Sequence, residues 1–280
     1  MRTIHLILQK LIPHHLLSRS TSAVANCNWP WMKNLLIKLF IRYFKVDMSE
    51  AVDADPTAYA CFNDFFTRSL RPGVRSICAD PDAVISPADG TISQIGSVDE
   101  GRILQAKSHL YSLHTLLGES DARSARFRDG KFVTIYLSPR DYHRIHAPQT
   151  GTLVDSVYLP GSLFSVNPHT VNNLPDLFLR NERLVTVFES SFGCLAVVMV
   201  GAMIVAGIHS VWRGECYPPG RVTNDTISAP IHLAKGAELG RFQLGSTVIL
   251  LFSPNSLRWL DHLAAGDSLQ MGQKIGSLTD

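Results

Sequence analysis

The dipeptide Gly245-Ser246 contains residue types that could carry out chemistry on the chain itself. Glycine has no side chain to shield its carbonyl carbon and tolerates strained backbone conformations. If a base removes the hydroxyl proton of Ser246, the oxygen can attack the carbonyl of Gly245 and replace the amide with an ester. β-Elimination of that ester would break the chain. Hydrolysis of the resulting dehydroalanine would leave a pyruvoyl group, an electrophilic ketone.

Such a serine needs a base, and the base needs a group that orients it. A segment that follows the strand-like run Lys131–Leu137 supplies two histidines three residues apart, His143 and His146. A turn bounded by Pro and Gly supplies Asp89. These are the residue types of a Ser-His-Asp triad, although a Gly-Ser pair alone is also typical of an ordinary turn that enters a strand.

Several stretches, in order along nearly the whole chain, carry a resemblance to a known family. They are residues 62–68, 87–90 (PADG), 136–146 (ending in DYHRIH), 160–167, 177–183, 200–205, 218–219 and 240–247 (ending in LGST). Together they resemble the phosphatidylserine decarboxylase proenzymes of the type found in Gram-negative bacteria. The LGST stretch is suggestive by itself, and its combination with DYHRIH and PADG makes the resemblance specific.

The resemblance implies that the chain converts phosphatidylserine to phosphatidylethanolamine and carbon dioxide, a step of phospholipid biosynthesis. It also implies a proenzyme that cuts itself between Gly245 and Ser246. The β chain would be residues 1–245 and the α chain residues 246–280, held together as a heterodimer. Ser246 would become the covalent pyruvoyl cofactor, which forms a Schiff base with the substrate amine. Pairing of two such heterodimers is left open.

The same resemblance implies a role for each site residue. Asp89, His146 and Ser246 would form the self-cleavage triad, in which His146 activates Ser246 and Asp89 orients His146. His143 would be the general acid that protonates the substrate carbon after carbon dioxide leaves, a task that suits a histidine with a near-neutral pKa. The alternative for His143 is packing or a part in processing. We expect no metal, because the two histidines follow a strand and no further ligand is near in sequence.

Three arginines, Arg140, Arg144 and Arg183, could bind the substrate phosphate or carboxylate, and structural ion pairing explains them equally well. Two rival functions use other features of the sequence. A Ser-His-Asp lipid hydrolase usually has its nucleophile in a G-x-S-x-G elbow, which does not occur in this sequence. A non-catalytic membrane-binding β domain would leave the Gly-Ser pair, the histidines and Asp89 unexplained.

Charge is unevenly distributed along the 280 residues, whose formal net charge is +2. No Asp or Glu precedes Asp47, although that stretch carries seven Lys and Arg residues. A basic N-terminus of this kind could bind nucleic acid, target an organelle or lie on an anionic membrane. Because the basic residues alternate with apolar and aromatic ones, we expect the membrane surface as partner and no nucleic acid.

Segment 31–45 shows the clearest helical pattern in this N-terminal region. Its apolar residues recur at helical spacing, namely Leu36, Leu39, Phe40, Tyr43 and Phe44. Flanking Lys and Arg residues favour an amphipathic helix at a membrane interface, and a helix that packs on the core is the alternative. We expect residues 1–50 to be the membrane-associating helical region of a peripheral protein on the cytoplasmic side of the inner membrane.

The remaining sequence, 51–280, is expected to form the catalytic domain. From about residue 83, short apolar runs separated by Gly and Pro predict a β-rich fold. The expected strands include Lys131–Leu137, 184–189, 194–200, 202–208 and 248–252, with helices at 107–117 and 256–263. The fold class is therefore α+β, with N-terminal amphipathic helices on a β-sandwich or barrel-like body.

Two further features limit where the protein works. The longest apolar run, 195–208, is shorter than the roughly 20 residues that cross a bilayer as a helix. The five cysteines form no C-x-x-C pair, which favours a reducing compartment and argues against a disulfide framework.

Overall fold

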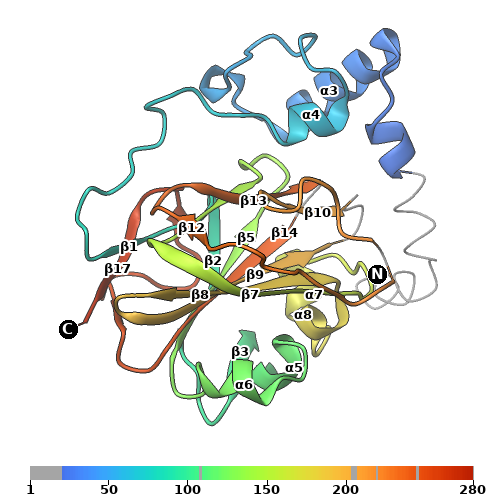
Figure 1. The fold of residues 1–280 in the computed structure, drawn as a ribbon. Coiled ribbons are helices and arrows are strands. Elements are labelled where there is room, and N and C mark those ends of the chain that lie inside the picture. Colours follow the sequence, from blue (N-terminus) through green and yellow to red (C-terminus); the bar gives the residue numbers. More distant parts are fainter. Residues whose placement is uncertain (1–20, 107–108, 203–206, 219, 244–245, 280) are drawn as a thin grey trace.

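The computed structural model describes residues 21–106, 109–202, 207–218, 220–243 and 246–279 (Figure 1). Its helices are α3 (Pro30–Phe44), the 3-10 helix η1 (Met48–Glu50), α4 (Phe62–Phe66), α5 (Leu113–Leu116), α6 (Asp121–Ala125), α7 (Pro168–Val171) and α8 (Leu177–Arg180). Its first strands are β1 (Ala83–Ile85), β2 (Gly90–Ser97), β3 (Arg102–Ala106), β4 (His109–Ser112), β5 (Lys131–Leu137), β6 (Arg144–His146), β7 (Gly151–Leu159), β8 (Arg183–Ser190) and β9 (Gly193–Gly201). The later strands are β10 (Gly207–Ser210), β11 (Thr223–Asn224), β12 (Ile231–Leu233), β13 (Glu238–Gln243), β14 (Ser246–Phe252), β15 (Leu257–Trp259), β16 (Ser268–Leu269) and β17 (Lys274–Leu278).

A nine-stranded antiparallel sheet forms the centre of the body. Its order is β11-β7-β8-β9-β14-β5-β2-β16, and β12 also pairs with β7. Within the described part of the chain the two end strands, β11 and β16, do not meet, so the sheet stays open. The expected α+β class with a mostly β body is confirmed, whereas the barrel-like alternative is wrong for these strands.

Both faces of this sheet are covered, which explains why β14 reads as an unbroken apolar run. Side chains of a strand alternate between faces. Val248, Leu250 and Phe252 therefore enter a core shared with the small sheets β1-β17-β15 and β10-β13-β6. Ile249 and Leu251 enter a second core on the other face, together with residues of α5, α7 and α8.

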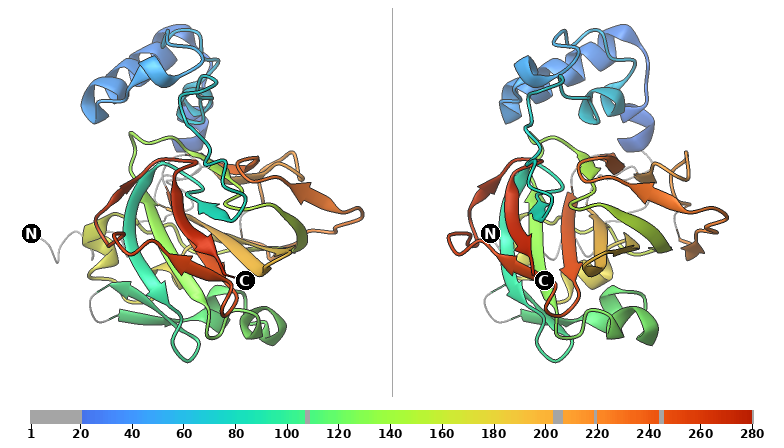
Figure 2. Two further views of the ribbon diagram at one scale, coloured as in Figure 1. Left: turned by 90° about the vertical axis from the view of Figure 1, so that its left-hand side faces the viewer. Right: turned by 60° about the vertical axis from the view of Figure 1, so that its left-hand side comes forward.

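The N-terminal helices form a separate layer beside the body. Figures 1 and 2 show α3 and α4 on one side of the sheets, at the end opposite β3, α5 and α6. The layer has its own small core, in which Ile37 of α3 and the α4 residues Phe62, Phe65 and Phe66 are buried. The helix expected at 31–45 is confirmed as α3, which begins with a proline whose missing N–H costs nothing at that position.

Helix α3 divides the residues of its apolar pattern between two faces. Leu36, Phe40 and Phe44 pack against the core of the N-terminal layer. A second set, which we call the exposed stripe, recurs every four residues on the outer face. It consists of Trp31 (65% exposed), Leu35 (52%), Leu39 (55%) and Tyr43 (79%). The core-packing interpretation of this helix is therefore confirmed for its inner face, and the membrane-interface interpretation stays a prediction for the outer face.

Two expected helices are replaced mainly by strands. Residues 109–112 form β4, which pairs with β3, and only Leu113–Leu116 is helical. Within 256–263, residues Leu257–Trp259 form β15 and pair with β17. Part of the strand expected at 202–208 lies outside the described residues. Among the described helices, none is long and apolar enough to cross a membrane.

Candidate active site

Ser246 is the first residue of β14, in the middle of the large sheet. It pairs with Leu137 of β5 on one side and with Gly201 of β9 on the other. Its side chain is 0% exposed, and its Oγ is buried without a hydrogen-bond partner. An unpaired buried hydroxyl lowers the stability of the fold by roughly 1–3 kcal/mol, so this potential nucleophile is kept at a cost in folding free energy. Gly245, the other half of the expected cleavage site, lies outside the described residues.

His146 ends β6, and both of its ring nitrogens are occupied. Nδ1 lies 2.8 Å from the carbonyl oxygen of Gly236, and Nε2 lies 3.0 Å from the hydroxyl of Tyr142. A carbonyl only accepts hydrogen bonds, so Nδ1 carries the proton and Nε2 is the basic nitrogen. Burial lowers the pKa of His146, which keeps the ring neutral. The carbonyl of Gly236 thus fixes the tautomer, the task that a triad normally gives to its aspartate.

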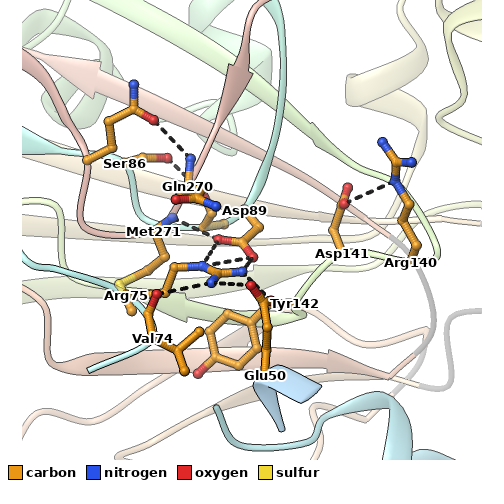
Figure 3. A network of polar contacts seen from close by, with 12 residues as sticks. Glu50, Val74, Arg75, Ser86, Asp89, Arg140, Asp141, Tyr142, Gln270 and Met271 are labelled. Atoms are coloured by element: carbon orange, nitrogen blue, oxygen red, sulfur yellow. Dashed lines mark hydrogen bonds and ion pairs between the residues drawn. The ribbon is translucent and has the colours of Figure 1, made fainter. Parts of the chain in front are cut away.

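The carboxylate of Asp89 is held by an arginine rather than by His146. Arg75 places Nε 2.9 Å from Oδ1 and Nη2 2.5 Å from Oδ2, and the amide of Met271 donates to Oδ1 at 2.8 Å. Figure 3 shows Arg75 lying between Asp89 and Glu50, to which it donates two further hydrogen bonds of 2.9 and 2.7 Å. We call these three side chains the Arg75 clamp. The two carboxylates raise the pKa of the Arg75 guanidinium.

Asp89 and His146 nevertheless belong to neighbouring segments. The backbone N–H of His146 donates to the carbonyl of Pro87 at 2.8 Å, which fastens β6 to the turn that carries Asp89. The negative charge of Asp89 raises the pKa of His146 and so works against the effect of burial. In the described part of the chain, no hydrogen bond links Asp89 to His146 or His146 to Ser246. Asp89 and His146 therefore lie in neighbouring segments, and the described residues show no closed hydrogen-bond chain through the expected triad.

His143 lies in the loop between β5 and β6 and is completely buried. Its Nδ1 donates to the carbonyl of Asp141 at 2.8 Å, and its Nε2 has no partner. Its ring packs against Phe66 of α4, with 4.0 Å between the ring centroids. Burial lowers the pKa of His143 to about 3. The free ring is consequently neutral at pH 7, with its lone pair on Nε2.

The N-terminal layer is bound to the loop that carries His143. Arg68, buried beside Phe65, donates from Nη2 to the carbonyl of Arg140 at 3.2 Å. Arg144 donates from Nε to the carbonyl of Thr67 at 2.8 Å and from Nη1 to Glu238 at 2.9 Å. Together with the Arg75 clamp, these contacts place the helical layer directly against the candidate site.

The three arginines expected as ligands of a phosphate or carboxylate have different surroundings. Arg183 is buried and donates to four backbone carbonyls, those of Thr115, Leu116, Leu179 and Asn181. The contacts of Arg144 described above use its guanidinium inside the protein. The Arg140 side chain, in contrast, is 67% exposed and lies 3.8 Å from Asp141. Of the three, Arg140 is the one placed to meet a ligand from solvent.

The residues present fit a cofactor that is made from the chain. Within the described residues, no group of three or more His, Cys, Asp or Glu side chains is arranged to hold a metal ion. The unpaired Oγ of Ser246 is the atom whose release would generate a pyruvoyl group at the start of β14. Sequence reasoning missed Arg75 and Glu50, because Arg75 reaches Asp89, and Glu50 reaches Arg75, only when segments 14 and 25 residues apart come together in the fold.

Comparison with known proteins covers nearly the whole chain. The sequence profile of the family described as "Phosphatidylserine decarboxylase" matches residues 62–277, and a profile described as "PSD" matches residues 4–45. A "Phosphatidylserine decarboxylase proenzyme" of Azotobacter vinelandii is 53% identical over 273 residues, 96% of each chain. The protein of the same name from Bordetella pertussis is 54% identical over 272 residues, 95% of this chain and 92% of the relative. That of Pseudomonas fluorescens strain Pf0-1 is 51% identical over 275 residues, 96% of each chain.

Proposed function

The chain belongs to the phosphatidylserine decarboxylase family, and from that premise we propose that it removes carbon dioxide from phosphatidylserine to give phosphatidylethanolamine. The observation that carries the proposal is the buried, unpartnered hydroxyl of Ser246, which follows a glycine at the start of the central strand. A lipid hydrolase usually carries its serine in a G-x-S-x-G elbow, which does not occur in this sequence. A purely structural β domain would gain nothing from leaving this hydroxyl unpaired.

The chain is a proenzyme that cuts itself between Gly245 and Ser246 in this proposal. The β chain then comprises residues 1–245 and the α chain residues 246–280. The pyruvoyl group that replaces Ser246 supplies a carbonyl that takes up the substrate amine and accepts the electron pair released with carbon dioxide. The extensive pairing of β14 with β5 and β9 supports a lasting association of the two chains, because both of these partner strands belong to the β chain.

His146 is the base of self-cleavage, and Nε2 is the atom that takes the proton of Ser246. The carbonyl of Gly236 supports this assignment because it keeps the other nitrogen protonated. For Nε2 to serve Ser246, the imidazole must exchange its hydrogen bond with Tyr142 for one with the serine. Asp89, held by Arg75, contributes its negative charge and stabilises the imidazolium that forms.

His143 moves the proton of the decarboxylation itself. Because its pKa is lowered to about 3, the free imidazole cannot donate a proton near pH 7 and must first receive one. Its unpaired Nε2 can accept that proton from the ammonium of the incoming substrate. The same nitrogen then returns the proton to the carbon that has lost carbon dioxide. His143 is thus a base first and the expected general acid second.

The N-terminal region, residues 1–50, brings the enzyme to the membrane that contains its substrate. The exposed stripe of α3 supports this role, because aromatic and aliphatic side chains favour the lipid headgroup zone. Lys38, Arg42 and Lys45 of the same region are exposed and suit an anionic surface. The five free cysteines accord with a reducing compartment, and we place the enzyme peripherally on the cytoplasmic side of the inner membrane.

Alanine variants of the two histidines test whether His146 acts in self-cleavage and His143 in decarboxylation. We expect His146→Ala to remain a single chain, because its task precedes cleavage. His143→Ala should be cleaved yet release at least 100-fold less carbon dioxide from vesicles that contain phosphatidylserine, in line with the loss of a general acid–base group. Cleavage at normal rate in His146→Ala would remove it from the triad. Full activity of His143→Ala would exclude the proton-transfer role.

A further inference from the structure

Glu182 is a buried carboxyl group at the candidate site that the family resemblance leaves without a role. Its residue is 5% exposed, and the hydroxyl of Tyr158 donates to Oε2 at 2.7 Å. No Lys or Arg forms an ion pair with it in the described part of the chain. An isolated buried carboxyl is costly to keep unless it is neutral or has a function, so its surroundings are informative.

Glu182 lies in the same cross-strand row as Ser246. The backbone N–H of Gly201 donates to the carbonyl of Glu182 at 2.9 Å, next to the pair Arg183 and Val200 of β8 and β9. Gly201 in turn pairs with Ser246 of β14. Residues directly opposite one another in an antiparallel sheet project their side chains from the same face. Glu182 and Ser246 therefore share a face, with Gly201 between them.

The absence of a side chain at Gly201 lets Glu182 occupy the space between the two strands. A Cβ atom built on Gly201 would lie 2.8 Å from Cγ of Glu182 and 3.1 Å from its Oε1. The Glu182 side chain thus leans over β9 toward β14. The carboxyl group therefore lies over β9, the strand between Glu182 and β14, on the face from which the Ser246 side chain projects.

The electrostatic state of Glu182 suits a proton donor. Burial raises its pKa, and the hydrogen bond from Tyr158 opposes that rise only in part. Tyr158 is itself fixed, because its ring stacks on Tyr217 with 5.2 Å between centroids. A carboxyl group that holds its proton more tightly than usual, on the same face of the sheet as a buried serine, is suited to give a proton to that serine's oxygen.

We propose that Glu182 protonates Oγ of residue 246 when the ester intermediate of self-cleavage breaks. This inference rests on the proposed function, since it concerns the second step of the same processing reaction. In the first step His146 passes the hydroxyl proton of Ser246 to the nitrogen of Ser246 as the Gly245–Ser246 amide bond breaks, which leaves the imidazole neutral again. His146 then takes the Cα proton of residue 246, and the electron pair of that bond forms the Cα=Cβ double bond. The Cβ–Oγ bond breaks with its electrons on Oγ, and Glu182 donates its proton there. The products are dehydroalanine at 246, a neutral carboxyl group on Gly245 and a Glu182 carboxylate.

The role predicts a specific defect in Glu182→Gln. Glutamine keeps the size of the side chain but cannot transfer a proton, so the ester should form normally and break on the order of 100-fold more slowly. Hydroxylamine cleaves such an ester and leaves an α chain that begins with an unmodified serine. We therefore make Glu182→Gln by cell-free synthesis, stop the synthesis and follow the finished chains over time. We expect these chains to be cut only when hydroxylamine is added.

Two matched variants control for the surroundings of the carboxyl group. Tyr158→Phe removes the hydrogen bond to Oε2 but retains the acid, and it should self-cleave without accumulating ester. Gly201→Ala keeps the glutamate at position 182, but the added Cβ of Ala pushes its carboxyl group away. This variant should therefore accumulate ester as Glu182→Gln does. If thermal unfolding shows that Glu182→Gln does not fold, Gly201→Ala decides the question by the same hydroxylamine assay.

The outcomes separate this inference from the proposed function. Cleavage of a folded Glu182→Gln chain at the wild-type rate, with no hydroxylamine-sensitive ester, would overturn the role of Glu182 and leave the decarboxylase proposal intact. A wild-type chain that is never cut would overturn the proposed self-processing itself.

Discussion

Two buried polar regions of the protein differ in how fully their hydrogen-bonding groups are satisfied. At the start of β14, Oγ of Ser246 has no partner, and Nε2 of His143 in the neighbouring loop has none either. Around Asp89, in contrast, the carboxylate accepts hydrogen bonds from Arg75 and from the amide of Met271, and Arg75 also binds Glu50. An unpaired buried polar group costs free energy, and at Ser246 and His143 the unpaired atom is the one that the proposed chemistry uses. We call the surroundings of Asp89 the saturated region, and its hydrogen bonds hold the side chains of the site in position.

The largest effect should come from the unsatisfied region. Ser246→Ala should abolish self-cleavage, because it removes the attacking oxygen, while the free energy of unfolding stays within about 1 kcal/mol of the unprocessed chain. Thr247→Val is the matched control. It removes another unpaired buried hydroxyl one residue away, on the opposite face of the strand, and should leave cleavage unchanged. Denaturing gels and thermal unfolding give both readouts, and cleavage of Ser246→Ala at this bond would contradict the mechanism.

The saturated region should respond through stability. Arg75→Ala leaves the carboxylates of Asp89 and Glu50 without their ion-pair partner. We expect it to lower the free energy of unfolding by about 3 kcal/mol, as the loss of one partner of a buried ion pair does. Glu50→Gln keeps a hydrogen-bonding side chain and should cost only about 1 kcal/mol. Urea denaturation of the two variants measures the difference. An Arg75→Ala variant as stable as Glu50→Gln would show that the clamp does not hold Asp89.

The unpaired histidine predicts how stability depends on pH. The pKa of His143 is lowered from 6.5 to about 3 in the folded chain, so the unfolded chain binds the extra proton. Its contribution to stability is complete above pH 6.5 and is lost as the pH falls toward 3, by about 1.4 kcal/mol per pH unit. His143→Gln should flatten this part of the curve, measured by denaturation at a series of pH values. Parallel curves for the variant and the wild type would contradict the lowered pKa.

The smallest effect on stability is expected in the exposed stripe of the helical layer. Leu39→Glu should change the free energy of unfolding by less than about 0.5 kcal/mol yet weaken binding to anionic vesicles about tenfold or more, because a leucine contributes roughly 1.5–3 kcal/mol when buried. Phe40→Ala, one residue away on the inner face, should instead destabilise the layer by about 3 kcal/mol. Vesicle co-sedimentation with unchanged affinity for Leu39→Glu would remove the stripe from the membrane contact.

The central strands could be predicted from sequence because their apolar runs are buried on both faces. The runs 131–137, 184–189, 194–200 and 248–252 correspond to β5, β8, β9 and β14 within two residues at each end. The helices expected at 107–117 and 256–263 failed because pairing with β3 and β17 overrode the local pattern. The split of α3 into an inner and an outer face also depends on what packs against it, which periodicity alone does not specify.

The same distinction applies to the candidate site. The motifs, together with the family resemblance, select Ser246, His143, His146 and Asp89 as candidate site residues, and their roles stay predictions. Motif spacing could not identify Arg75 or Glu182, because each acquires its partners only when separate strands and turns come together. Nor could it show that the carbonyl of Gly236, rather than Asp89, fixes the His146 tautomer.

The most direct test of the account is the intact mass of the purified wild-type protein under denaturing conditions. We predict two chains that meet at Gly245 and Ser246, with the chain of residues 246–280 lighter by one ammonia than the same segment beginning with serine. That mass difference identifies a pyruvoyl terminus. A single full-length mass in protein that actively decarboxylates phosphatidylserine would contradict self-processing at Ser246 and with it the central claim.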